Sequence, residues 1–226
     1  MAEYKKFYVA FFDVLGFKTL INKNDCEYIR NIFDNFKKSN VLIKDDDDKA
    51  IIFNNDDVCL KIMSDSIVFY VDASIPNACL GLLCHCAAFQ ADLLTCNTPV
   101  LIRGGISYGD FYIEEEKDII FGPALTEAYL LEEKSAKYPR IIVNKSTLDI
   151  SERDYKHLVF RDDDAFYSVN SYAMLSLLEQ ANKTIINRIY SEIEKHLDST
   201  VDSSIREKYL YLEKKMKQFN LGENNV

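Results

Sequence analysis

Two aspartates stand at positions where a carboxylate could bind a metal ion. Asp13 interrupts the apolar stretch FYVAFFDVLGFK at residues 7–18, and Asp65 stands in the SDS break between two strand-like runs. An unpaired carboxylate in a buried strand is unfavourable, so Asp13 either caps the helix that follows or binds a cation. Carboxylate oxygens suit Mg²⁺ or Mn²⁺, which also use waters and substrate phosphates. A pair of such ions would support phosphoryl chemistry, whereas the simpler alternative for Asp65 is an ordinary turn residue.

The turn after Asp13 has a composition that favours phosphate binding. VLGFK, residues 14–18, contains Gly16 and leads into a helical pattern. The first amides of a helix and its dipole attract an anion such as a triphosphate. Together with the two aspartates, this turn predicts a nucleotide–metal site at the end of the first strand.

The elements that position these residues follow from hydrophobic periodicity. A strand is predicted at 5–12, a helix after Gly16, and a solvated loop in KDDDDKA at 44–50. The SDS break predicts a hairpin between its two flanking runs. Further strands are predicted at 51–63, 66–73, 99–113, 119–121 and 140–144, and further helices at 77–96 and 123–137.

This element order predicts an α+β fold. Two β-α-β halves in the order β-α-β-β-α-β form an antiparallel ferredoxin-like sheet with helices on one face. We expect a catalytic-type domain at 1–150 and an appendage at 151–226. The appendage is predicted to contain a hairpin that turns at 162–164 and a helical region at 171–219 that breaks near LDSTVDSS.

Composition excludes several classes of protein. The chain has 226 residues and a formal charge of −9, which argues against a nucleic-acid binder because phosphate contacts need clustered cations. No apolar run reaches the length of a membrane span, and no signal-peptide pattern is present at the N-terminus. The six cysteines sit mostly in apolar patterns and predict reduced thiols in the cytoplasm. Among them, Cys84 and Cys86 flank a histidine, but residues two apart face different directions on a helix, so we expect helix core rather than a zinc site.

The chain resembles the class III nucleotide cyclase family over residues 6–148. Four motifs carry the resemblance: a strand ending in Asp-x-x-Gly-Phe, a second aspartate in a hairpin, an Arg-x-Gly-Ile-x-x-Gly strand, and a Gly-x-x-aliphatic-x-x-Ala helix start that runs to a Leu-Glu pair. The matching residues are Asp13, Gly16 and Phe17; Asp65; Arg103, Gly105, Ile106 and Gly109; and Gly122, Leu125, Ala128, Leu131 and Glu132.

The resemblance implies cyclisation of a nucleoside triphosphate by attack of its 3′-hydroxyl on the α-phosphorus, with loss of pyrophosphate. It implies two Mg²⁺ or Mn²⁺ ions and a homodimer with active sites shared between subunits. The implied metal ligands are Asp13, Val14 and Asp65, and the implied nucleotide-binding residues are Leu15, Gly16, Phe17, Lys61 and Thr126.

Three positions depart from the family pattern. Thr126 replaces an asparagine that orients the ribose, Leu130 replaces an arginine that stabilises the transition state, and Ile119 replaces an aspartate that reads adenine. The lost arginine would have stabilised a developing oxyanion. Candidate substitute cations, which could equally be solvated charges at a helix end, are Lys134, Lys137 and Arg140.

The chain lacks these purine-reading residues but keeps both metal aspartates. Its FFDVLGF start and its block FGPALTEAYLLE…YPRIIV resemble the bacterial pyrimidine cyclases of antiphage signalling. That branch implies cyclic CMP or cyclic UMP as product and a separate effector protein that binds it. Two alternatives stay open. One is a degenerate cyclase-homology domain that binds a nucleotide or a partner without turnover, as Leu130 would favour. The other is a palm-type polymerase or diguanylate-cyclase relative, although no acidic pair follows Gly104 and Gly105.

Overall fold

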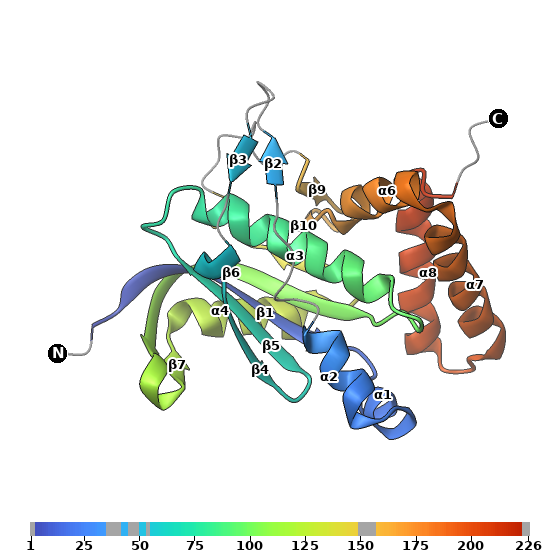
Figure 1. Ribbon diagram of the computed structural model, residues 1–226, viewed down its shortest axis with the longest axis horizontal. Helices are drawn as coiled ribbons and strands as arrows, with labels where there is room; N and C mark the ends of the chain where they lie inside the picture. The colour runs from blue at the N-terminus through green and yellow to red at the C-terminus, as the bar shows by residue number, and fades with distance from the viewer. Residues whose placement is uncertain (1–2, 35–41, 45–49, 53–54, 149–156, 223–226) are drawn as a thin grey trace.

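The strand that carries Asp13 lies inside the main sheet. The structure is a computed structural model that describes residues 3–34, 42–44, 50–52, 55–148 and 157–222 (Figure 1). Strand β1 (Lys5–Val14) pairs antiparallel with β5 (Ser66–Asp72) on one side and with β6 (Ile102–Glu114) on the other. The register places Asp13 opposite Ser66 on one neighbour and opposite Arg103 on the other.

The main sheet is mixed. Its order is β4-β5-β1-β6-β8-β10-β9, and β7 pairs with β6 off this path. Adjacent strands among β4, β5, β1 and β6 pair antiparallel, whereas β6 and β8 run parallel. The predicted α+β class is therefore confirmed. The other strands of this sheet are β4 (Cys59–Met63), β7 (Ile119–Phe121), β8 (Ile141–Val143), β9 (Val159–Arg161) and β10 (Tyr167–Val169).

The region before the β4–β5 hairpin differs from its prediction. The run predicted as one strand at 51–63 is divided into β3 (Ala50–Ile52), a single 3₁₀ turn (Asn55–Asp57) and β4. Strand β3 pairs with β2 (Leu42–Lys44) in a separate two-stranded sheet. The loop predicted in KDDDDKA falls largely on residues 45–49, which lie outside the described residues.

Helices cover both faces of the main sheet. On one face, Phe12 packs against Phe69 and against Phe89 of α3 (Ala78–Leu94), with ring centroids 5.1 and 5.3 Å apart. Helices α1 (Phe17–Lys23) and α2 (Cys26–Asp34) contribute to the same core cluster. The expectation of helices on one face is incomplete, because α4 (Pro123–Ser135) packs on the opposite face of β1 and β6 (Figure 1).

Gly105 allows α4 to approach the sheet closely. A Cβ atom added there would lie 2.6 Å from the Cβ of Leu131, closer than real side chains tolerate. The glycine therefore fixes how near α4 lies to the strand that carries Arg103.

Helix α3 is mostly apolar, and most of its residues are buried. Cys84 and Cys86 are 1% and 0% exposed, which confirms the helix-core interpretation of CHC. Burial raises the pKa of the Cys84 thiol to about 12. None of the helices in the described ranges has the length and apolarity needed to cross a membrane.

The C-terminal region packs on the first part of the chain. The predicted helical region forms α6 (Ser171–Ala181), α7 (Lys183–Ser199) and α8 (Ser203–Gln218), with the expected break before Ser203 and a second break at Asn182. Apolar residues of these helices form one cluster with Ala91 and Leu94 of α3. The predicted hairpin is β9–β10, and it extends the main sheet through β8. The appendage is thus continuous with the main sheet.

A buried ion cluster joins α8 to the β9–β10 hairpin. Lys215 Nζ lies 2.7 Å from Asp162 Oδ1, and both side chains are at most 1% exposed. Arg140 Nη1 donates to Asp162 Oδ2 at 2.8 Å, and its other terminal nitrogen pairs with Asp164. Burial acts to raise the pKa of Asp162, but hydrogen bonds from its neighbours lower that pKa to about 2. The cluster therefore holds an ionised carboxylate between α8 and the sheet.

Candidate functional site

The residues predicted to bind metal come together at one end of β1. Asp13 and Val14 are the last two residues of that strand, and Asp65 lies in the two-residue turn between β4 and β5. The amide of Val14 donates to the backbone oxygen of Asp65 at 3.0 Å. Ser64, the other turn residue, has φ of 59° and so lets the chain reverse directly beside β1. Two aspartates distant in sequence therefore occupy adjoining backbone positions.

Arg103 contacts Asp13 from the neighbouring strand. Its Nε donates to Asp13 Oδ2 at 3.2 Å and lies 2.7 Å from Oε1 of Glu132 on α4. The Nε atom of arginine has a single hydrogen, which points to Asp13. Oε1 of Glu132 consequently has no aligned donor within the part of the chain that the structure describes. One guanidinium thus lies between two carboxylates and satisfies only one of them well.

Glu132 has an unusual protonation equilibrium as a result. Its side chain is 4% exposed. Burial raises the pKa of its carboxyl to about 7; nearby Arg103 acts in the opposite direction, and Asp13 reinforces the rise. Near neutral pH this carboxyl therefore exchanges a proton next to the candidate site.

The donor set at the end of β1 fits a magnesium-type ion. Asp13 and Asp65 offer carboxylate oxygens, and the Val14 carbonyl is a further hard donor. Mg²⁺ is commonly held by one or two carboxylates together with waters and substrate phosphates. Within the described ranges, no group of three or more His, Cys, Asp or Glu side chains could hold a metal ion. The arrangement therefore suits an ion that arrives with a phosphate ligand better than a permanently bound one.

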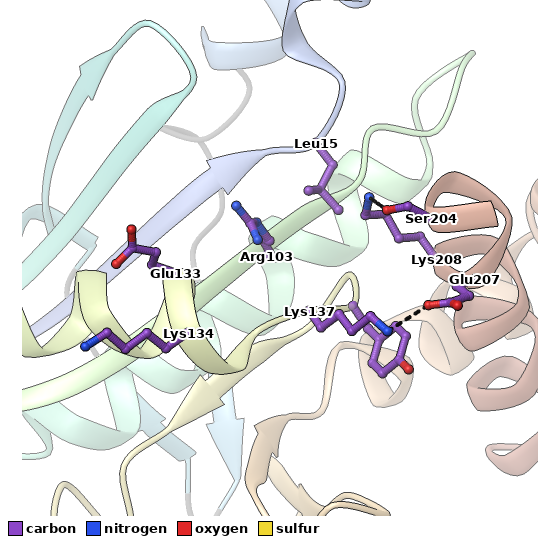
Figure 2. A pocket seen from close by; sticks show the side chains of 9 residues that line it. Leu15, Arg103, Glu133, Lys134, Lys137, Ser204, Glu207 and Lys208 are labelled. Carbon is purple, nitrogen blue, oxygen red and sulfur yellow. Dashed lines mark hydrogen bonds and ion pairs between the residues drawn. The ribbon is translucent and has the colours of Figure 1, made fainter. Parts of the chain in front are cut away.

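A polar cavity of about 380 Å³ opens beside Leu15 and Arg103 (Figure 2). Two of the predicted substitute cations, Lys134 and Lys137, line it. Lys137 Nζ is paired with Glu207 of α8 at 2.8 Å. The complete lining is Leu15, Arg103, Glu133, Lys134, Lys137, Tyr138, Ser204, Glu207 and Lys208.

A second, mainly apolar cavity of about 590 Å³ contains two predicted nucleotide-binding residues, Lys61 and Thr126. The ammonium of Lys61 forms an ion pair with Asp118. Asp118, which directly precedes Ile119, was not predicted from the sequence to belong to the site. The complete lining is Phe11, Lys61, Ile62, Met63, Ser66, Val68, Asp118, Ile120, Leu125, Thr126 and Tyr129.

Three predicted residues lie apart from these cavities or act differently from expectation. Arg140 is 4% exposed and belongs to the buried ion cluster, so its placement is structural and it does not line the polar cavity. Phe17 packs against the core, with its ring 6.4 Å from that of Phe33. Gly16 adopts φ of 73° before the short helix α1, a conformation that favours glycine. Gly16 and Phe17 therefore shape the turn that presents Leu15.

A scan of protein-family models and a search of curated proteins find no match to this chain, so the class of protein has to be inferred from the site itself.

Proposed function

We propose that this protein is a metal-dependent nucleotide cyclase with a ferredoxin-like core of the class III type. Its substrate is a nucleoside triphosphate, CTP or UTP, and its products are a 3′,5′-cyclic nucleotide and pyrophosphate. The observation that carries the proposal is the adjacency of Asp13 and Asp65 at the end of β1. The strand order β4-β5-β1-β6 supports it, because this is the order of an antiparallel βαββαβ sheet.

The reaction requires an in-line displacement at the α-phosphorus. The 3′-oxygen forms a bond to that phosphorus, the bond to the bridging oxygen of the β-phosphate breaks, and the hydroxyl proton leaves to solvent or a base. Asp13, Asp65 and the Val14 carbonyl would hold Mg²⁺ or Mn²⁺, which lowers the pKa of the hydroxyl and neutralises phosphate charge. Lys134 offers a cation in place of the arginine missing at Leu130.

The separation of the two cavities favours a homodimer with shared active sites. Leu15 and Arg103, which lie close to Asp13, line the polar cavity, whereas Lys61 and Thr126 line the apolar one. In the proposed dimer, the apolar cavity of one subunit holds the nucleoside whose phosphates lie at the carboxylates of its partner. The 76% exposed side chain of Met63 and the 41% exposed Tyr129 would be covered by such contact. Large exposed apolar side chains around a cavity are typical of interaction surfaces.

The apolar cavity offers polar groups to a base. The Lys61–Asp118 pair supplies one donor group and one acceptor group. Purines and pyrimidines both carry the two kinds of group on one edge, so the choice of a pyrimidine rests on the resemblance to the pyrimidine cyclases and not on this pair. The product would be a cytoplasmic second messenger that binds a separate effector protein in antiviral signalling.

Product analysis tests the proposal. Purified protein is incubated with each of the four ribonucleoside triphosphates and Mn²⁺, and the products are identified by mass spectrometry. We expect cyclic CMP or cyclic UMP from the wild type and none from Asp65→Asn, which keeps the shape of the side chain. Asp198→Asn is the matched control, because Asp198 is exposed on α7 and should keep full activity.

A binding module without turnover is the second candidate. Leu130, 36% exposed on α4, stands where the family pattern has its transition-state arginine and favours this reading. Metal-dependent nucleotide binding with no cyclic product from any triphosphate would establish the module and exclude the cyclase.

A further inference from the structure

The polar cavity contains side chains from α8 that the proposed chemistry does not use. Ser204 and Lys208 are four residues apart and therefore face the same side of the helix. Figure 2 shows both extending toward Leu15, the residue directly after β1. Lys208 Nζ lies 3.2 Å from Ser204 Oγ. A hydroxyl and an ammonium from the C-terminal region thus reach the site formed by the first half of the chain.

Lys208 is available to an anion, unlike two of the other cations nearby. Lys137 is paired with Glu207, and Arg103 is paired with Asp13. Within the part of the chain that the structure describes, Lys208 forms no ion pair, and Ser204 is its hydrogen-bond partner. The contact of Lys208 with Ser204 is exposed to solvent, and an ammonium without a counter-ion gains by forming a charge-assisted hydrogen bond with a negatively charged group.

The charge of the cavity has the sign that a polyphosphate requires. Four cationic and two anionic side chains are among its nine lining residues, although the whole chain carries a formal charge of −9. Arg103 is matched by Asp13 and Lys137 by Glu207, so the excess positive charge of the lining lies on Lys134 and Lys208. Concentrated charge of one sign in a concave site raises the local concentration of the opposite ion.

The same face of α8 that carries Lys208 is anchored to the sheet. Tyr211 and Lys215 lie three and seven residues after Lys208, so all three belong to one stripe of the helix. Tyr211 donates to Asp162, and Lys215 forms the buried ion pair with the same carboxylate. This anchoring fixes the part of α8 from which Lys208 extends toward Leu15.

We propose that α8 completes the active site by supplying Lys208, with Ser204, to the β- and γ-phosphates of the triphosphate. The inference rests on the proposed function for the identity of the substrate. It assigns the C-terminal helices a direct part in substrate binding, with the polyphosphate lying between α8 and the turn after β1.

Binding of inorganic tripolyphosphate tests this assignment without requiring turnover. Isothermal titration calorimetry on the full chain should show that Lys208→Ala weakens tripolyphosphate binding about tenfold or more, as expected for loss of a hydrogen bond to a charged group. Lys208→Met keeps the apolar stem and should show the same loss, with an unchanged circular dichroism spectrum. Lys217→Ala is the matched control on α8, because Lys217 pairs with Glu213 and does not line the cavity.

The outcomes separate this inference from the proposed function. Equal tripolyphosphate affinity in the wild type and both Lys208 variants, or no binding by the wild type, would overturn the α8 subsite whether or not a cyclic product forms. Lys208-dependent binding without any cyclic product would retain the subsite and reject the cyclase. If both hold, Lys208→Ala should also raise the KM for the nucleotide, whereas Lys217→Ala should leave it unchanged.

Discussion

Glu132→Gln should change how stability depends on pH, because the wild-type carboxyl is buried beside a second carboxylate. Its pKa is 4.5 in the absence of the fold and about 7 within it. The folded state therefore binds this proton more tightly than the unfolded state does. The sign follows directly: the contribution is fully present below pH 4.5 and is lost as pH rises to 7.

The magnitude follows from the two pKa values. Linkage gives a loss of about 2.5 kcal/mol from the free energy of unfolding between pH 5 and pH 8 for this group alone. Its side chain is 4% exposed, so solvent screening reduces this figure little. Glutamine has no proton to release, and the variant should lack this loss.

Urea denaturation of the wild type and Glu132→Gln at pH 5 and pH 8 measures the difference. The free energy of unfolding of the variant minus that of the wild type should rise by about 2 to 3 kcal/mol between the two pH values. Other titrating groups cancel because they are common to both proteins. Glu133 is the next residue of α4 and is exposed. The free energy of unfolding of Glu133→Gln should therefore change with pH as that of the wild type does. If the free energy of unfolding of Glu132→Gln changed with pH as much as that of the wild type does, the burial argument would be refuted.

Two further predictions concern packing around the site. Lys215→Met should lower the free energy of unfolding, measured by urea titration, by about 3 to 5 kcal/mol, because it leaves a buried carboxylate without one of its cations. Lys214→Met is the control. It breaks only an exposed ion pair to the same hairpin and should lower the free energy of unfolding by at most about 1 kcal/mol. Gly105→Ala should lower it by about 1 to 3 kcal/mol and reduce turnover by displacing α4, as overpacking does. At Gly109 an added Cβ would lie 3.7 Å from the nearest α4 atom, so Gly109→Ala should leave stability nearly unchanged in thermal denaturation. If the two alanine variants lost the same stability, the argument that α4 approaches closely at Gly105 would be contradicted.

The fold was predictable where a local pattern determined it. The apolar run of β1 and the helix at 77–96 are long and strongly patterned, and both form as expected, with shifts of a few residues at their ends. The strand predicted at 51–63 was wrong as one element. Its apolar residues are interrupted by the polar sequence NNDD, within which Asn55–Asp57 form a 3₁₀ turn. Short polar interruptions of this kind are weak signals in a single sequence.

Within the candidate site, only the residues that belong to sequence motifs could be predicted. Asp13 and Asp65 adjoin as expected because a hairpin and a neighbouring strand bring them together. The Lys61–Asp118 pair was not predicted, because the two residues are 57 positions apart in the sequence and no local pattern joins them. The position of Lys208 follows from tertiary packing across more than 190 residues of chain, which no local pattern encodes. The burial of Lys215 was equally hidden, since lysine on an amphipathic helix normally faces solvent.

One measurement tests the central claim most directly: mass spectrometry of the products formed from CTP and UTP with Mn²⁺ by the wild type and by Asp13→Asn. The proposed mechanism predicts a 3′,5′-cyclic pyrimidine nucleotide and pyrophosphate from the wild type, and neither from the variant. A wild type that binds nucleotide in a metal-dependent manner but forms no cyclic product, or an Asp13→Asn variant that forms it at the full rate, would contradict the account.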